Sequence, residues 1–126
     1  MSTKSVLIVD DALIMRKRIR DIAQESGWAV AGEAQDGNEA VTLFRQTHPD
    51  LVTLDIVMPN LDGVAALKMI LQEDPLAHVV MVTAVDQRAK LLECIQIGAI
   101  DFIVKPFEKD RLSSFFERQL TMNSQQ

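Results

Sequence analysis

The chain has 126 residues, of which 48% are hydrophobic, and its 13 Lys and Arg against 18 Asp and Glu give a formal net charge of −5 at pH 7. A chain of this length corresponds to one domain, residues 1–126, which can bury about two-thirds of its unfolded surface without disulfides or a structural metal. The acidic balance argues against a nucleic-acid-binding surface, and no apolar stretch is long enough for a signal peptide or membrane insertion. The single cysteine, Cys94, fits a reducing compartment, so we expect a cytoplasmic protein.

Five short apolar segments, rich in Val, Ile and Leu, are predicted to be strands. They are Val6–Asp10, Ala29–Glu33, Leu51–Asp55, Val79–Thr83 and Asp101–Val104. Near-continuous apolar runs of this kind are typical of parallel strands that are covered on both faces.

Each predicted strand is followed by a segment in which apolar residues recur at helical spacing. The first four of these segments end at Ser26, before His48, before Asp74 and before Gly98. The fourth is expected to bury Leu91, Leu92, Ile95 and Ile97, and the polar tail from Thr121 to Gln126 is expected to fray. Five β–α units predict an α/β domain, with a doubly wound five-stranded parallel sheet and helices on both faces.

Polar residues follow four of the predicted strands. Asp10 and Asp11 end the first strand, Asp55 the third, Thr83 the fourth and Lys105 the fifth. Ligand sites of doubly wound sheets lie beyond the carboxyl ends of the strands, so these side chains are candidates for one site. If the first and third strands are neighbours, three carboxylates converge, and such a cluster of hard oxygens suits Mg²⁺.

A hydroxyl and an ammonium beside carboxylates and Mg²⁺ favour phosphoryl chemistry. Thr83 can donate a hydrogen bond to an oxyanion, and Lys105 supplies a compact positive charge that suits phosphate. Phosphoryl transfer depends mostly on positioning and on neutralising charge, and a carboxylate can itself be the nucleophile. Asp55 is the natural candidate for that nucleophile.

At this point the residues resemble the receiver domain of two-component response regulators, from Val6 to about Leu120. The acidic pair after Val6–Val9, the loop Asp55–Gly63, the pair Thr83–Ala84 and the motif Lys105–Phe107 each resemble a family motif. The segments Asp10–Arg16 and Gly98–Phe107 are similar to the CheY-like, chemotaxis branch of the family.

The resemblance implies a phosphorylation-activated signalling switch without ordinary enzyme turnover, which supports its own phosphorylation and dephosphorylation. It implies that Asp55 accepts a phosphoryl group from a sensor histidine kinase or phosphotransfer protein. It implies Mg²⁺ ligands at Asp10, Asp11, Asp55 and the backbone carbonyl of Val57, and phosphoryl contacts from Thr83 and Lys105.

The resemblance also implies how the signal leaves the domain. Thr83 and Phe102 are the expected switch pair, the Lys105–Pro106 bond is expected to be cis, and the strand order is expected to be 2-1-3-4-5. The readout face is expected to comprise the fourth helix, fifth strand and fifth helix. Its partner would be a downstream effector protein, which for a chemotaxis receiver would be the flagellar motor switch.

Two features depart from the best-known pattern of the chemotaxis branch. Phe102 stands where a tyrosine is often found, and Val57 and Val85 are apolar where well-known relatives carry polar groups. Because the two valines would flank the path of a water attacking the phosphoryl group, we expect slow self-dephosphorylation.

Three other functions remain open on the residues alone. A Mg²⁺-dependent phosphohydrolase could use the same aspartyl phosphate, although Ile56 and Val57 provide no second acid beside Asp55. A flavin or nucleotide binder would need a Gly- or Ser/Thr-rich loop where Asp10 and Asp11 stand. A receiver domain belonging to a longer DNA-binding or enzymatic regulator would have this same sequence pattern.

Overall fold

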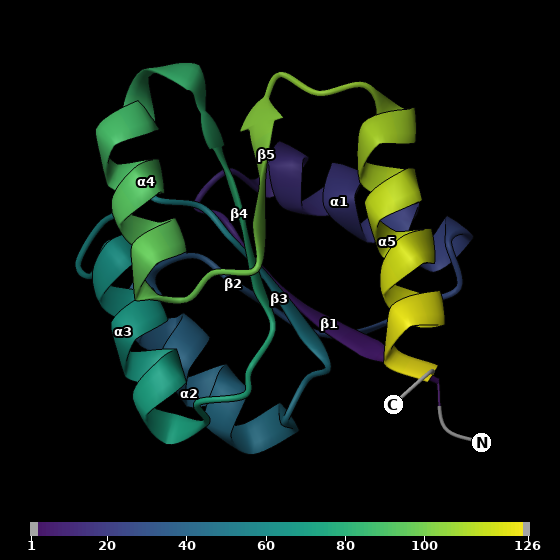
Figure 1. Ribbon diagram of the computed structural model, residues 1–126, viewed down its shortest axis with the longest axis horizontal. Helices are drawn as coiled ribbons and strands as arrows, with labels where there is room; N and C mark the ends of the chain where they lie inside the picture. Colours follow the sequence, from purple (N-terminus) through teal and green to yellow (C-terminus); the bar gives the residue numbers. More distant parts are fainter. Residues whose placement is uncertain (1–2, 125–126) are drawn as a thin grey trace.

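The structure is a computed structural model that describes residues 3–124, and it consists of a central parallel sheet between two layers of helices (Figure 1). Its elements in chain order are β1 (Ser5–Val9), α1 (Leu13–Glu25), β2 (Ala29–Ala34), α2 (Gly37–Thr47), β3 (Leu51–Leu54), α3 (Gly63–Glu73), β4 (Val79–Ala84), the short 3₁₀ helix η1 (Val85–Gln87), α4 (Arg88–Ile97), β5 (Asp101–Lys105) and α5 (Lys109–Ser124). Across residues 3–124, no helix combines the length and the apolar character needed to cross a bilayer.

The sheet has the strand order β2-β1-β3-β4-β5, and every neighbouring pair is parallel, which confirms the predicted fold class and order. The chain moves from β1 to β2 on one side and then returns to place β3 on the other side of β1. This reversal creates the crevice in which doubly wound sheets bind ligands. Val9 is in register with Leu54, so the residues that follow them, Asp10 and Asp55, emerge side by side.

Helices cover both faces of the sheet, as the apolar strands require. In Figure 1, α1 and α5 lie on one side of the sheet, and α2, α3 and α4 lie on the other. Under α1 and α5, Trp28 is buried, packs on Phe116 at a ring-centroid distance of 5.6 Å and donates its indole N–H to the Phe116 carbonyl. The opposite layer buries residues of β1, β3 and β4 against α2, α3 and α4.

Two aspartates fix the start of the helices that border the crevice. The Asp36 side chain accepts the Glu39 N–H at the beginning of α2, and the Asp62 side chain accepts the Ala65 N–H at the beginning of α3. Such N-caps satisfy backbone donors that have no partner within the helix. They therefore define where the β2–α2 and β3–α3 loops stop.

The fourth helix differs from the prediction. Only Leu91 and Cys94 of α4 are buried, whereas Leu92 is 59% exposed and Ile95 is 38% exposed. The reason is that α4 packs against α3 and β4 near the edge of the sheet, where one helical stripe suffices and the adjacent apolar stripe has nothing to cover. Thr121 to Ser124 belong to α5, and residues 125–126 lie outside the described part, so the fraying of the tail stays a prediction.

Candidate functional site

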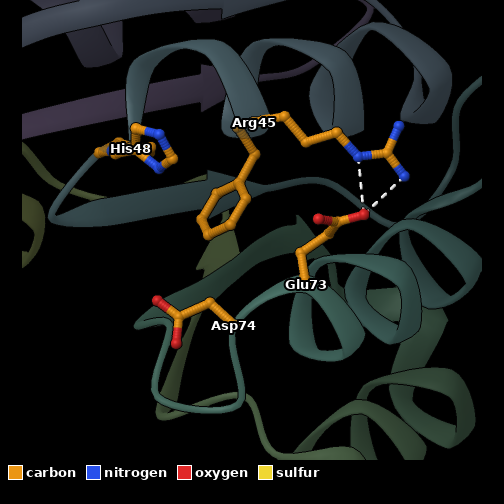
Figure 2. A pocket seen from close by; sticks show the side chains of 6 residues that line it. Arg45, His48, Glu73 and Asp74 are labelled. Atoms are coloured by element: carbon orange, nitrogen blue, oxygen red, sulfur yellow. Dashed lines mark hydrogen bonds and ion pairs between the residues drawn. The ribbon is translucent and has the colours of Figure 1, made fainter.

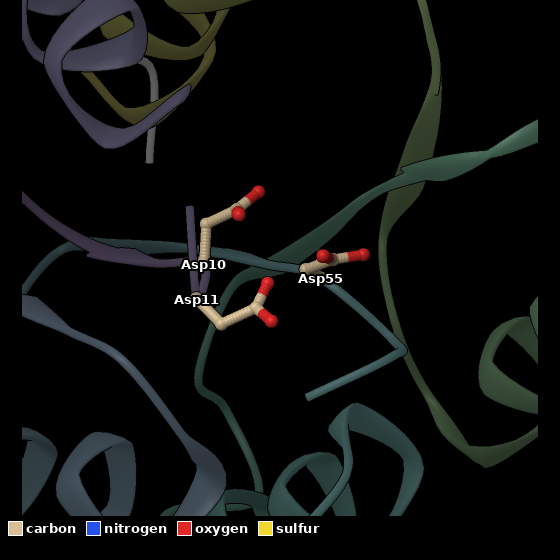
Figure 3. Close-up of side chains that lie close together, drawn as sticks. All are labelled: Asp10, Asp11 and Asp55. Carbon is tan, nitrogen blue, oxygen red and sulfur yellow. The ribbon is translucent and has the colours of Figure 1, made fainter. Parts of the chain in front are cut away.

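Three carboxylates gather where β1 and β3 end. Asp10, Asp11 and Asp55 each place one carboxylate oxygen within 4.8 Å of the other two (Figure 3). Asp10 and Asp55 are buried at 1% and 7% exposure, whereas Asp11 is exposed. We call this cluster of two buried acids and one exposed acid the recess.

Backbone contacts hold the two buried acids in place. The Asp55 N–H donates to the Val9 carbonyl at 3.1 Å, and the Asp10 N–H donates to the Ala34 carbonyl at 3.0 Å. The Asp55 carbonyl oxygen lies so close to Gly63 that a Cβ at that position would overlap it. The start of α3 thus presses on the backbone of Asp55, and only glycine permits that contact.

Lys105 reaches this recess from the end of β5. Its Nζ atom lies 2.5 Å from Oδ2 of Asp10 and 3.2 Å from Oδ2 of Asp55. The remaining oxygens of the two buried acids accept backbone N–H groups, Asp10 from Ala12 and Asp55 from Ile56. Lys105 cancels one of the three negative charges, which leaves a balance that a divalent cation could neutralise.

The charges in the recess shift one another's protonation. Burial raises the pKa of Asp55 above its usual value, the charge of Asp10 adds to this rise, and Lys105 opposes it. Burial alone would lower the pKa of Lys105, but its hydrogen bond to Asp10 and the charges of both acids outweigh burial and raise that pKa. Lys105 therefore remains a cation in the recess.

The donor set fits a hard divalent cation. Three carboxylates with mutual oxygen distances within 4.8 Å could hold a metal ion, and carboxylate oxygens are what Mg²⁺ prefers. The metal-binding prediction for Asp10, Asp11 and Asp55 thus has the geometry it needs. Val57, the predicted carbonyl ligand, follows Asp55 in the β3–α3 loop, and its side chain is 54% exposed.

Thr83 ends up beside the recess with an unused hydroxyl. It is fully buried near the end of β4, and its Oγ1 has no hydrogen-bond partner among residues 3–124. Its register partner on β5 is Val104, and Met81 pairs with Phe102, so Thr83 and Phe102 lie on the same face of the sheet. The Phe102 ring is 41% exposed, and its place on that face is next to α4.

Arg16 was not among the site residues predicted from the sequence, but in the structure it supports the backbone of Asp10. Arg16 is 8% exposed, donates to the Asp10 carbonyl at 2.8 Å and pairs with Glu33 at 3.2 Å. Its only sequence signal is its position three residues before Ile19, on the buried stripe of α1. A charged residue on a buried stripe needs a partner, and here the partner is the backbone that carries the acidic pair.

An apolar groove lies between α4 and β5. It has a volume of about 260 Å³ and is lined by Ala84, Val85, Arg88, Leu91, Leu92, Ile95, Phe102 and Val104. Except for Leu91, the large apolar residues of this lining are exposed or partly exposed. Ala84 in the lining directly follows Thr83 on β4, so strand β4 connects the groove to the recess.

A second hollow lies between the carboxyl ends of α2 and α3, remote from the carboxylates. It is lined by Phe44, Arg45, His48, Pro49, Glu73 and Asp74. Arg45 and Glu73 pair with each other at 2.7 Å (Figure 2), so these two charges offset each other. Among residues 3–124, the group of side chains that could hold a metal ion does not include His48, His78 or Cys94.

The fold and the side-chain cluster define a class of protein, namely a doubly wound α/β domain whose switch point carries three acids that could hold a cation, with a lysine beside them. The family model of the response regulator receiver domain matches residues 6–117. The chain is 48% identical to the chemotaxis protein CheY of Thermotoga maritima over 109 residues, covering 86% of this chain and 91% of that protein. It is 46% identical to CheY of Bacillus subtilis over 115 residues, covering 91% and 96%.

A solved structure gives the same result in three dimensions. The CheX–CheY–BeF3–Mg complex from Borrelia burgdorferi matches with a TM-score of 0.85 and 32% identity, covering 96% of this chain and 89% of that chain. The chain therefore belongs to the response regulator receiver domain family of two-component signalling, and its relatives include CheY proteins of chemotaxis.

Proposed function

We propose that this receiver domain is a phosphorylation-activated switch in which Asp55 accepts a phosphoryl group from a phosphohistidine on a sensor histidine kinase or phosphotransfer protein. The observation that carries the proposal is the position of Asp55. Asp55 and Asp10 both form an ion pair with Lys105. Asp55 also follows β3, and the neighbouring strand β4 carries Thr83, whose hydroxyl has no hydrogen-bond partner among residues 3–124.

The transfer is a substitution at phosphorus. A carboxylate oxygen of Asp55 forms the new O–P bond as the N–P bond of the donor phosphohistidine breaks, and the histidine leaves with the electron pair and takes a proton. Lys105, already 3.2 Å from Asp55, neutralises charge on the phosphoryl oxygens. Attack of water on the phosphorus of the resulting acyl phosphate releases inorganic phosphate and returns Asp55 to its carboxylate form.

The ligands proposed for Mg²⁺ are Asp10, Asp11, Asp55 and the backbone carbonyl of Val57. When bound, Mg²⁺ neutralises negative charge on the acids and on the incoming phosphoryl group. Arg16 keeps the Asp10 backbone fixed, and Ala12 and Ile56 orient the carboxylates of Asp10 and Asp55. These contacts present the acids without a rearrangement at the moment of transfer.

Thr83 and Phe102 are the proposed link between the recess and the surface. A phosphoryl oxygen offers the Thr83 hydroxyl the acceptor that it lacks, which draws Thr83 toward Asp55. The space that Thr83 leaves on its face of the sheet can then take the half-exposed Phe102 ring. Phosphorylation thereby favours one of two packings of α4 and β5.

The proposed readout face comprises α4, β5 and α5, and the groove between α4 and β5 is its apolar part. Leu92, Ile95 and Phe102 give it exposed apolar surface, and Arg88 adds a positive charge at its border. We propose that a cytoplasmic effector protein binds here, by analogy with CheY the flagellar motor switch, and that this domain contacts no nucleic acid. The same face would serve if the domain belonged to a longer regulator.

Labelling of the purified protein with acetyl phosphate and Mg²⁺ tests the proposal. Intact-mass spectrometry should show one phosphoryl group per chain, and Asp55→Asn should abolish it. Asp62→Asn is the matched control, because asparagine also caps helices and Asp62 lies in the same loop.

Two results would refute the switch. Labelling that persists in Asp55→Asn would place the acceptor elsewhere. Steady turnover of a generic phosphoester, instead of a single labelling event, would indicate the phosphohydrolase.

A further inference from the structure

The strands that carry Asp10 and Lys105 are not neighbours. In the order β2-β1-β3-β4-β5, two strands separate β1 from β5, which corresponds to roughly 14 Å between strand axes. Nevertheless, Lys105 Nζ lies 2.5 Å from Oδ2 of Asp10. Ladders of hydrogen bonds connect β1 to β5 only by way of β3 and β4, so contacts beyond the strand ends also influence where Lys105 lies relative to Asp10.

Helix α1 makes that connection through Arg18. The Arg18 guanidinium donates from Nη2 to the Phe107 carbonyl at 2.8 Å, and its Cζ lies 4.4 Å from the centroid of the Phe107 ring. Phe107 is buried and stands two residues after Lys105, in the segment between β5 and α5. The Arg18 side chain thus contacts both the backbone carbonyl and the aromatic ring of Phe107.

A second arginine of α1, Arg16, lies two residues before Arg18 and contacts the end of β1. Arg16 donates to the Asp10 carbonyl at 2.8 Å and is held by Glu33. Helix α1 is therefore hydrogen-bonded to the backbone at both places. Arg16 donates to the Asp10 carbonyl, and Arg18 donates to the carbonyl of Phe107, two residues after Lys105. A third tie, between Glu25 and Lys109 at 2.6 Å, joins α1 to the start of α5.

We propose that Arg18 is a positioning residue for Lys105, which it holds at the distance from Asp10 and Asp55 that phosphoryl transfer requires. The inference rests on the proposed function, because it assigns Lys105 to the phosphoryl oxygens. It adds a residue on α1 that touches neither the acids nor the phosphoryl group. It separates the rate of phosphoryl transfer from Mg²⁺ affinity, since Arg18 acts on Lys105 and leaves the proposed metal-binding acids in place.

The test compares Arg18→Gln with wild type at saturating Mg²⁺. Acetyl phosphate should label Arg18→Gln about tenfold more slowly, because small displacements of a charge-stabilising group weaken transfer strongly. The Mg²⁺ dissociation constant from calorimetry should not change. Arg18→Lys, which keeps a cation near the Phe107 carbonyl, should recover part of the rate.

Lys17→Gln is the matched control, because Lys17 is an exposed cation on the same helix, next to Arg18 in the sequence. It should label at the wild-type rate. Equal slowing in Lys17→Gln, or a joint loss of Mg²⁺ affinity and rate in Arg18→Gln, would show a general effect on α1 and overturn the inference. Wild-type labelling rates in both Arg18 variants would overturn it as well.

A readout in the unphosphorylated protein separates this inference from the proposed function. The Lys105 ammonium is shielded and hydrogen-bonded, so its protons should exchange slowly enough for detection by ¹⁵N NMR. The signal should weaken in Arg18→Gln and persist in Lys17→Gln. If the variants show this pattern but the wild-type protein accepts no phosphoryl group, the proposed function fails and the positioning of Lys105 stands. An unchanged signal in Arg18→Gln refutes the positioning alone.

Discussion

The ammonium group of Lys105 lies 3.2 Å from Oδ2 of Asp55, although strand β4 separates the strands that carry them. The residue in register with Lys105 on β4 is Ala84, whose methyl group leaves room for a long side chain to cross that strand. The contact brings a cation to a carboxylate that burial and Asp10 disfavour as an anion. Lys105 therefore offsets one of the three negative charges of the recess, and a bound divalent cation would offset the other two.

Asp55→Asn should stabilise the protein at neutral pH in the absence of divalent cations. The pKa of Asp55 is raised in the folded state by burial and by Asp10, so the folded protein binds its proton more readily than the unfolded chain. Its contribution to stability is thus present at low pH and is lost as the pH rises through the folded-state pKa. Urea unfolding at pH 7 with a chelator should show a gain of about 1 kcal/mol for Asp55→Asn.

The gain should disappear when the pH falls below the usual carboxyl value of 3.8, where Asp55 is protonated in both states. Added Mg²⁺ should stabilise wild type more than Asp55→Asn, because the variant lacks one proposed ligand. Asp21→Asn, which removes an exposed carboxylate on α1, should change stability little. A less stable Asp55→Asn at pH 7 would contradict this electrostatic account.

Gly63→Ala should destabilise the protein and slow labelling of Asp55. A Cβ on Gly63 would overlap the Asp55 carbonyl oxygen, and neither backbone segment can move freely because the Gly63 N–H donates to the Ile56 carbonyl at 2.7 Å. Overpacking against backbone costs about 1–3 kcal/mol and would displace Asp55. Gly32→Ala is the control, since its Cβ would make ordinary contacts at 3.5 Å with the Leu7 side chain. Equal unfolding midpoints for the two variants would count against the prediction.

The sequence predicted the sheet well because its signal is local. Apolar runs between helical segments identify buried parallel strands, and a polar residue after each run identifies the strand end. Asp10, Asp55, Thr83 and Lys105 therefore emerged from position alone, and the structure brings them to one edge of the sheet. The strand order came only from the family resemblance, because apolar runs do not specify which strands are neighbours.

Other features have no local signal. Arg18 and Phe107 are 89 residues apart, and nothing in either segment marks them as partners. Leu92 and Ile95 resemble core residues because helical spacing shows which residues share a stripe but not which stripe a sheet edge covers. Their exposure depends on the position of α4 near the edge of the sheet, which helical spacing does not specify.

Two buried threonines should separate stability from signalling. Thr53 and Thr83 are 1% and 0% exposed, and neither hydroxyl has a partner among residues 3–124. Replacing either by valine removes an unsatisfied polar group and should raise the free energy of unfolding by about 1 kcal/mol. Thr53→Val should otherwise behave as wild type, because Thr53 lies in the middle of β3 and has no proposed part in the switch.

Thr83→Val should accept the phosphoryl group but lose most of the phosphorylation-dependent gain in effector affinity. Its isosteric side chain fills the same space and cannot donate a hydrogen bond to a phosphoryl oxygen. Binding titrations of both phosphorylated variants against the effector distinguish the two roles. Normal activation of Thr83→Val would refute the proposed link to Phe102.

Val57→Asn should shorten the lifetime of the phosphorylated protein. Val57 and Val85 are 54% and 72% exposed, two residues after Asp55 and Thr83 respectively, so apolar side chains stand at the positions proposed to flank the attacking water. An amide there can hydrogen-bond and orient that water, which should speed hydrolysis roughly threefold to tenfold. Val57→Leu, which alters size without adding a polar group, should leave the lifetime unchanged. Following the decay of the phosphorylated mass after the donor is removed gives both rates, and equal lifetimes for Val57→Asn and Val57→Leu would show that the apolar pair does not control hydrolysis.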